Sequence, residues 1–186
     1  MADVVGLLLQ EHANLAKLLD AVERQLAVFE EGESPDYDIV QGVLDYCLNY
    51  PDLYHHPKED LVFERLRVRD PAAAEALGDL QAEHRRLGAL TRRFAAAVRN
   101  LLQDLEIPRE AFDQVAREFL DHYRRHMDME ERVFLPAAVR SLTAEDWAEI
   151  DAQVTAREDP VFGTPQGEER FEALREKVLA WAREGG

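Results

Sequence analysis

Cysteine is almost absent from this sequence. Its 186 residues include one cysteine, Cys47, which excludes an intrachain disulfide and any zinc or iron–sulfur site built from several thiolates. A lone cysteine is most simply a small buried packing residue. No apolar run reaches about 18 residues, so we expect no membrane span. No basic segment precedes an apolar one near residue 1, so we expect no signal peptide and, by default, a cytoplasmic location.

Positive charge is also scarce. The chain has 22 Lys and Arg residues against 38 Asp and Glu residues, and its formal net charge is −16. Such a surface repels phosphate backbones and anionic lipid. We therefore expect neither nucleic acid nor a membrane surface as a partner.

Helical periodicity, in contrast, is abundant. Apolar residues spaced by three and four, the pattern of an amphipathic helix, recur in four long segments. These segments cover about residues 3–30, 36–68, 71–101 and 108–136. With short connections between them, they predict an all-α fold in which residues 1–140 form an up-down-up-down four-helix bundle.

Several local signals refine this prediction. Ser34 and Pro35 are typical of the N-cap and first position of a helix, as are Asp70 and the proline after it. Pro51 and Pro57 interrupt the second helix, and each removes a backbone donor. We therefore expect a kink or a loosened turn near residues 50–54.

Residues 141–186 predict a helical C-terminal extension without obvious chemistry. Thr143 is expected to cap a short helix that ends near residue 156, and a loop over 157–167 precedes a last amphipathic helix over about 168–184. The extension is expected to pack either on its own bundle or on a partner subunit. In the second case the protein would be a homodimer.

One short motif occurs twice. His55 and Glu59 are four residues apart, as are His126 and Glu130, and in both copies another acid and a Val-aromatic pair follow. Residues four apart lie on one face of a helix, so each copy can aim an imidazole and a carboxylate at one point. The acids that follow, Asp60 and Glu131, are expected to orient metal-bound imidazoles or to be solvated.

Histidines follow the inward stripes of all four helices. The six are His12, His55, His56, His84, His122 and His126, and five of them replace an apolar residue in a seam. Burying so many polar groups without partners would be unfavourable, whereas bound cations explain them together. Imidazoles with carboxylates and no thiolate suit iron, manganese or zinc. So many ligands exceed the needs of one ion, so we expect two, bridged by Glu59 and Glu130.

The ordered set of residues resembles the hemerythrin-like, or HHE cation-binding, domain family, in its bacterial branch. The resemblance covers about residues 3–140 and implies a four-helix bundle that holds a non-haem di-iron centre with carboxylates and an oxo or hydroxo group as bridges. It thereby implies iron ahead of manganese or zinc. It assigns the following residues as metal ligands: His12, His55, Glu59, His84, His126 and Glu130.

One ligand of the oxygen-carrying members is missing from this pattern. Those members have a second histidine one turn from the position of His84, where this chain has Leu80 and Gly88. His122, one turn before His126, is one candidate replacement. The other candidates are Tyr50, Tyr54 and Tyr123. His56 forms an alternative His-x-x-x-Asp pair with Asp60, but the internal repeat favours the register of His55 and Glu59.

Three functions remain open from the sequence. The first is a di-iron protein that binds or senses O2 or a related small oxidant. The second is a di-iron oxidoreductase acting on peroxide or nitric oxide, with His122 or Tyr123 as an acid or base. The third is an iron-handling protein, which a buried and fixed two-ion site favours least.

Overall fold

The computed structural model describes residues 3–103, 105, 107–154, 159–163 and 171–184. The described residues form helices and no strand. The elements are α1 (Asp3–Glu30), α2 (Tyr37–Tyr50), η1 (Pro51–His55), α3 (His56–Arg69), α4 (Pro71–Leu77), α5 (Leu80–Leu102), α6 (Arg109–Met129), η2 (Glu130–Phe134), α7 (Leu135–Ser141), α8 (Ala144–Gln153) and α9 (Glu172–Glu184).

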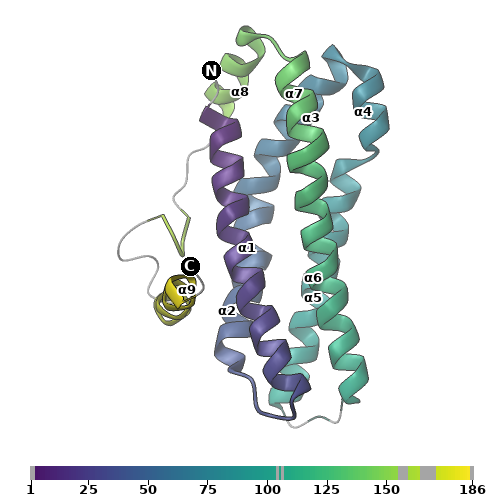
Figure 1. Ribbon diagram of the computed structural model, residues 1–186. Helices are drawn as coiled ribbons and strands as arrows, with labels where there is room; N and C mark the ends of the chain where they lie inside the picture. Colours follow the sequence, from purple (N-terminus) through teal and green to yellow (C-terminus); the bar gives the residue numbers. More distant parts are fainter. Residues whose placement is uncertain (1–2, 104, 106, 155–158, 164–170, 185–186) are drawn as a thin grey trace.

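Long helical rods run side by side in a bundle (Figure 1). α1 packs against α2 and α6, and α5 packs against the same two helices, so the rods close into a ring. The all-α helical bundle expected from the periodicity is confirmed. No described helix is long and apolar enough to cross a membrane.

Two helix boundaries differ from the prediction. Asp36, rather than Ser34, caps α2, and its carboxylate accepts a hydrogen bond from the backbone N–H of Ile39. Asp70 caps a helix as predicted, but that helix, α4, ends at Gly78. The φ of +79° at Gly78 suits glycine because it has no Cβ, and α5 then starts afresh. The predicted third helix is therefore two helices.

The expected loosened turn is present as a π-helical turn, η1, and a second one, η2, occurs in the other copy of the motif. In η1 the N–H of His56 reaches back five residues to Pro51, and in η2 the N–H of Leu135 reaches back to Glu130. A proline without an N–H comes directly afterwards in both copies. Because a π turn holds one extra residue, it rotates the helix after the turn relative to the helix before it.

A polar layer divides the apolar interior of the bundle in two. On α1, Leu8 belongs to one buried cluster and Leu15 to the other, and the buried His12 lies between them. The larger cluster includes Phe94 and Phe119, and the smaller includes Phe134. Both clusters hold the backbone on either side of the polar layer, which positions its side chains.

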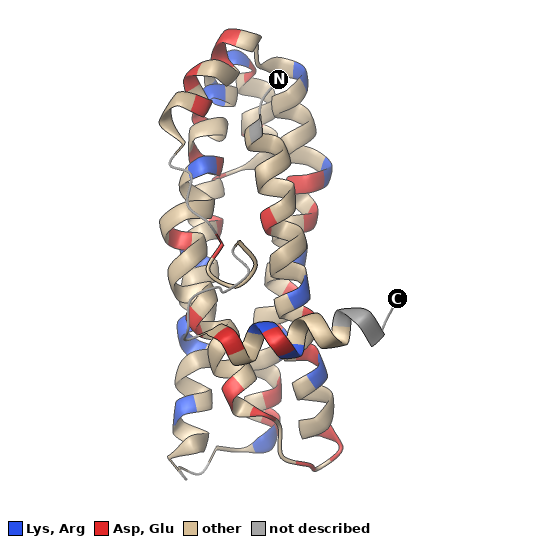
Figure 2. Cartoon of the chain, turned by 90° about the vertical axis from the view of Figure 1, so that its left-hand side faces the viewer, with Lys and Arg blue, Asp and Glu red and all other residues tan. Residues whose placement is uncertain are grey.

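The C-terminal extension packs on the bundle. α8 begins with the capping box predicted at Thr143, in which the Thr143 and Asp146 side chains bond each other's backbone N–H. α9 lies across the bundle (Figure 2) and packs on α1 and α2, where Gly42 leaves room for Leu174. Most of the predicted loop at 157–167 and the predicted start of the last helix lie outside the described residues.

Asp159 fastens the extension to the helices beside the polar layer. It is buried, and its Oδ2 accepts hydrogen bonds from Asn14 of α1 and from the hydroxyl of Tyr46 of α2, each at 3.1 Å. Its Oδ1 accepts the backbone N–H groups of Val161 and Phe162 at 2.9 and 3.0 Å. One carboxylate thus links three segments of the chain.

Replacing Asp159 by alanine is expected to lower the free energy of unfolding by about 2–4 kcal/mol, because buried donors would lose their acceptor. Urea unfolding measures this loss, and hydrogen exchange should show faster exchange in α9. Asp151→Ala, at an exposed position of α8, is the control and should change neither. An unchanged urea midpoint in Asp159→Ala would contradict this role.

Candidate metal centre

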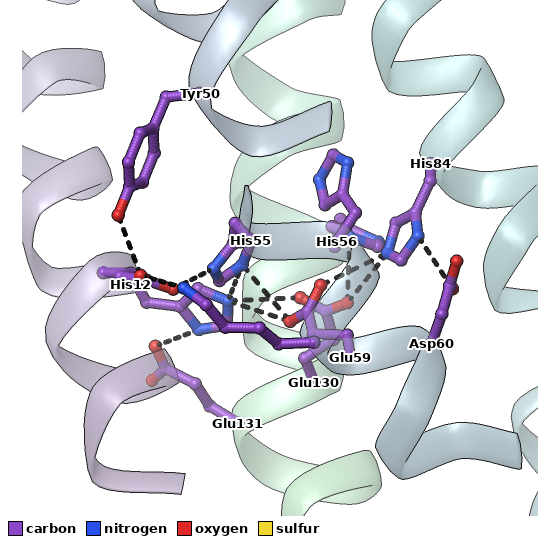
Figure 3. Close-up of polar contacts among 12 residues, drawn as sticks. His12, Tyr50, His55, His56, Glu59, Asp60, His84, Glu130 and Glu131 are labelled. Carbon is purple, nitrogen blue, oxygen red and sulfur yellow. Dashed lines mark hydrogen bonds and ion pairs between the residues drawn. The ribbon is translucent and has the colours of Figure 1, made fainter. Parts of the chain in front are cut away.

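Seven buried side chains meet in the polar layer, and they come from all sides of the bundle (Figure 3). Each is at most 7% exposed. They are His12 of α1, His55 of η1, His56 and Glu59 of α3, His84 of α5, His126 of α6 and Glu130 of η2.

One group of potential ligands consists of His12, His55, Glu59 and Glu130. The Nε2 atoms of His12 and His55 are 3.0 Å apart. The Nε2 of His12 lies 3.4 Å from Glu59 Oε1 and 3.4 Å from Glu130 Oε2. Neighbouring ligand atoms about 3 Å apart are what metal–ligand bonds of about 2.1 Å at right angles produce. These four side chains therefore have the spacing of one coordination sphere.

A second group consists of His56, Glu59, His84 and His126. The Nε2 of His84 lies 3.3 Å from Glu59 Oε2 and 3.5 Å from Glu130 Oε1. The Nε2 of His126 lies 3.0 Å from the same oxygen of Glu130. The ring of His56 stacks on that of His84, with centroids 4.0 Å apart.

The two glutamates connect the groups. Glu59 directs Oε1 to His12 and His55 and Oε2 to His84. Glu130 directs Oε2 to His12 and Oε1 to His84 and His126. Each carboxylate thus offers one oxygen to each side, which is the arrangement of a bridging ligand.

The unpaired atoms of this layer match the needs of a metal. Among the described residues, both oxygens of Glu59 and of Glu130 and both ring nitrogens of His84 and His126 are buried without a hydrogen-bond partner. These atoms contact one another only as ion pairs. Burying carboxylates and imidazoles without regular hydrogen bonds is costly, and cations would compensate them. The side chains present therefore fit bound metal ions.

A comparison with protein families agrees with this geometry. The model of the hemerythrin HHE cation-binding domain matches residues 3–138. The chain belongs to this family. No curated protein and no solved structure matches the chain. Cation binding is therefore implied by the family and supported by the histidine and glutamate groups of this hemerythrin HHE domain.

The metal-free centre balances its own charges. Burial and the nearby Glu59 raise the pKa of Glu130, but contacts with His12, His126 and His84 lower it to about 2. Burial lowers the pKa of His12, but Glu130 and Glu59 outweigh this and raise it to about 10. Burial also lowers the pKa of His84, but contacts with Asp60, Glu130 and Glu59 outweigh this and raise it to about 11. Two imidazolium groups therefore face two carboxylates.

Metal binding by this HHE domain should therefore release protons. His12 and His84 are protonated at neutral pH in the metal-free chain, because their pKa values of about 10 and about 11 lie above it. An imidazole must be neutral to bind a metal, so His12 and His84 should each release about one proton at about pH 7.5 and affinity should fall as the pH falls. Calorimetry in buffers of different ionisation enthalpy counts the released protons. Binding with no proton release would contradict this charge balance.

Carboxylates face the outer nitrogen of four of the histidines. A carboxylate at Nδ1 favours the tautomer that carries its proton there, which would leave the other nitrogen, Nε2, able to bind a metal. Three pairs are hydrogen bonds at Nδ1: His12–Glu131 at 3.1 Å, His55–Glu11 at 2.8 Å and His56–Asp52 at 3.1 Å. The fourth, His84–Asp60 at 3.5 Å, is an ion pair without a hydrogen bond. Asp60 and Glu131 thus lie where the sequence suggested an orienting role, whereas Glu11 and Asp52 were not foreseen.

The structure brings together six of the seven residues that the sequence proposed as ligands, and His122 is the exception. Its Nε2 lies 3.1 Å from Oε2 of Glu83, and His122 belongs to neither ligand group found among the described residues. His56 lies in the second group instead. The sequence feature that could have indicated His56 as a ligand was the adjacent pair of histidines at the predicted loosened turn. A π turn lets both His55 and His56 face inward.

The candidate tyrosines have other contacts. The Tyr50 hydroxyl donates a hydrogen bond to Glu11 at 2.9 Å. The Tyr123 hydroxyl is buried beside Cys47 and Thr91. Burial raises the pKa of the Cys47 thiol to about 12, so at neutral pH it is a packing group and not a thiolate.

Proposed function

We propose that this HHE domain holds two non-haem iron ions bridged by Glu59 and Glu130, and that it binds or senses O2 or a related small oxidant there. The observation that supports two ions is that each glutamate offers one oxygen to each ligand group. Five imidazoles and two carboxylates also exceed what one ion uses.

The ligand chemistry is compatible with iron. Imidazole and carboxylate donors without thiolate suit iron, manganese and zinc, and Cys47 is engaged in packing. Bound iron would supply reversible exchange of electrons with an oxidant. The chain itself would hold the ions, orient the imidazoles through their carboxylate partners and exclude bulk water with the apolar clusters on both sides.

A pocket of about 430 Å³ gives small molecules a route to the second ligand group. Its lining includes both stacked imidazoles, His56 and His84, together with Gly88 and Arg92. We infer that an oxidant arrives on this side. The absence of a side chain at Gly88 keeps part of the pocket open.

Gly88→Leu should slow the reaction of the reduced, iron-loaded protein with O2 several-fold at unchanged iron content. A Cβ at residue 88 would lie 3.3 Å from the Arg92 guanidinium and 3.5 Å from the Asp52 carboxylate, and the rest of the leucine would extend into the pocket. Stopped-flow absorbance measures the rate. Gly6→Leu is the control, because nothing lies within 4 Å of its Cβ position. An unchanged rate in Gly88→Leu would rule out this route.

An oxidoreductase acting on peroxide or nitric oxide is the second candidate, and the same pocket supports it because those molecules are equally small. An iron-handling role has less support. The ligands are buried between two apolar clusters, which suits a resident centre better than a store that must exchange its ions.

The deciding experiment is the metal content per chain of protein purified without a metal-binding tag, with its visible spectrum in air. About two irons per chain with charge-transfer bands would support the proposal. Zinc in their place would keep the site but remove the redox function. A folded chain that takes up no iron under anaerobic loading would overturn the proposal of an iron centre. Cycling with O2, peroxide and nitric oxide then separates binding from turnover.

A further inference from the structure

We propose that the buried ion pair between Glu11 and Lys58 sets the reduction potential of the metal position held by His12 and His55, which makes the two halves of the centre electronically different. This inference rests on the proposed iron centre. It adds three positioning residues that act on the metal position only through His55: Glu11, Lys58 and Tyr50.

Hydrogen bonds connect Lys58 and Tyr50 through Glu11 to His55, and Figure 3 labels Tyr50 and His55 among these residues. Oε2 of Glu11 lies 2.8 Å from Nδ1 of His55, whose opposite nitrogen faces the first ligand group. The other oxygen, Oε1, accepts hydrogen bonds from the Lys58 ammonium and from the Tyr50 hydroxyl. Glu11 therefore passes the influence of two donors to one imidazole.

Burial separates this carboxylate from the other three that face imidazoles. Glu11 and Lys58 are 5% and 2% exposed. The side chains of Asp52, Asp60 and Glu131 are 41%, 32% and 44% exposed, so water screens their charges. A charge acts more strongly on its neighbours where water is excluded. The Glu11 carboxylate is thus the one best placed to act on its imidazole.

A buried lysine is an unfavourable residue for a structural role alone. Its ammonium loses its hydration, and an aliphatic side chain of similar length would fill the space without that penalty. Lys58 lies on the same helix as Glu59, one residue before the proposed bridge, yet it points to the Glu11 side. The ammonium is therefore best explained by its effect on the Glu11 carboxylate.

The direction of that effect follows from the hydrogen bonds. A carboxylate that accepts the N–H of a metal-bound imidazole makes that imidazole a stronger donor, which favours the oxidised metal and lowers the reduction potential. Lys58 and Tyr50 withdraw charge from the same carboxylate and so counteract it. Removing Glu11 and removing Lys58 should therefore shift the potential in opposite directions.

The test is spectroelectrochemical titration of the full chain, loaded anaerobically with iron, with the metal content measured on each sample. Glu11→Gln should raise the midpoint potential, and Lys58→Met should lower it. Tyr50→Phe should lower the midpoint potential by a smaller amount. If Lys58→Met fails to fold, Tyr50→Phe shows whether removing a donor to Glu11 lowers the potential. The exposed pair Arg93 and Glu118 supplies the controls, because Arg93→Met and Glu118→Gln should leave the potential unchanged.

A merely structural role would loosen His55 in every variant, so the shifts would share one sign and iron content would fall. Shifts of one sign, or no shift with iron retained, would overturn the inference while leaving the proposed function standing. A wild-type chain that binds no iron would overturn both.

Discussion

Glu59→Gln is expected to reduce iron from about two ions per chain to less than one, because glutamine keeps the volume but removes the charge that both positions share. Each oxygen of Glu59 faces a different ligand group, so glutamine leaves one group a weaker, neutral amide oxygen and gives the other an NH2 group that cannot bind a metal. Few single replacements would reach both halves of the centre. Metal analysis and the visible spectrum after anaerobic loading measure the loss.

The charge balance of the centre gives this variant a second expected effect. Without the carboxylate of Glu59, the raised pKa values of His12 and His84 should fall, because Glu59 is one of the groups that raise them. Glu64→Gln, at an exposed position of the same helix, is the matched control and should retain all the iron. Full iron content in Glu59→Gln would show that this carboxylate is not shared between two ions.

His56→Ala is expected to remove one of the two ions and leave the other. His56 belongs to the group with His84 and His126, whereas the group with His12 and His55 does not include it. His56→Phe separates ligation from packing, since a phenyl ring can still stack on His84 but has no nitrogen to offer. Both variants should contain about one iron per chain.

His122→Ala is the comparison that decides whether His56 or His122 is the metal ligand. It should retain both ions, because His122 lies beside Glu83 and outside both ligand groups found in the described part of the chain. The opposite result, with one ion lost from His122→Ala and none from His56→Ala, would restore the assignment made from sequence. Circular dichroism of each variant checks that the bundle is intact.

The helical bundle was determined by local sequence. Apolar residues spaced by three and four must share one stripe, whatever the rest of the chain does, and burying that stripe requires neighbouring helices. The same spacing rule put Glu130 one turn from His126, and their Nε2 and Oε1 atoms are 3.0 Å apart. Histidines on the inward stripes, such as His12 and His84, were foreseeable as members of a shared site for that reason.

Two histidines lie differently from what the stripe pattern predicts, because a stripe assumes uniform helix rotation. The π turn over Pro51–His55 holds one more residue than an α turn, so its end is rotated and both His55 and His56 face the interior. The prolines in the sequence indicated a disturbed helical turn, but they did not indicate the angle by which the helix rotates there. His122 shares the stripe of His126, yet it lies one turn away along the bundle and reaches Glu83 instead.

Contacts between helices were decided only by the tertiary structure. Nothing local connects Glu11 with Lys58, or Asp159 with Tyr46, because their side chains meet through the distance and relative rotation of separate elements. Those quantities depend on how whole helices pack, and one sequence stripe is compatible with several packings. The sequence by itself therefore determined the helices, the motif and most of the proposed metal ligands. The carboxylates that lie beside those residues, and the position of His56 among them, depended on how the helices come together.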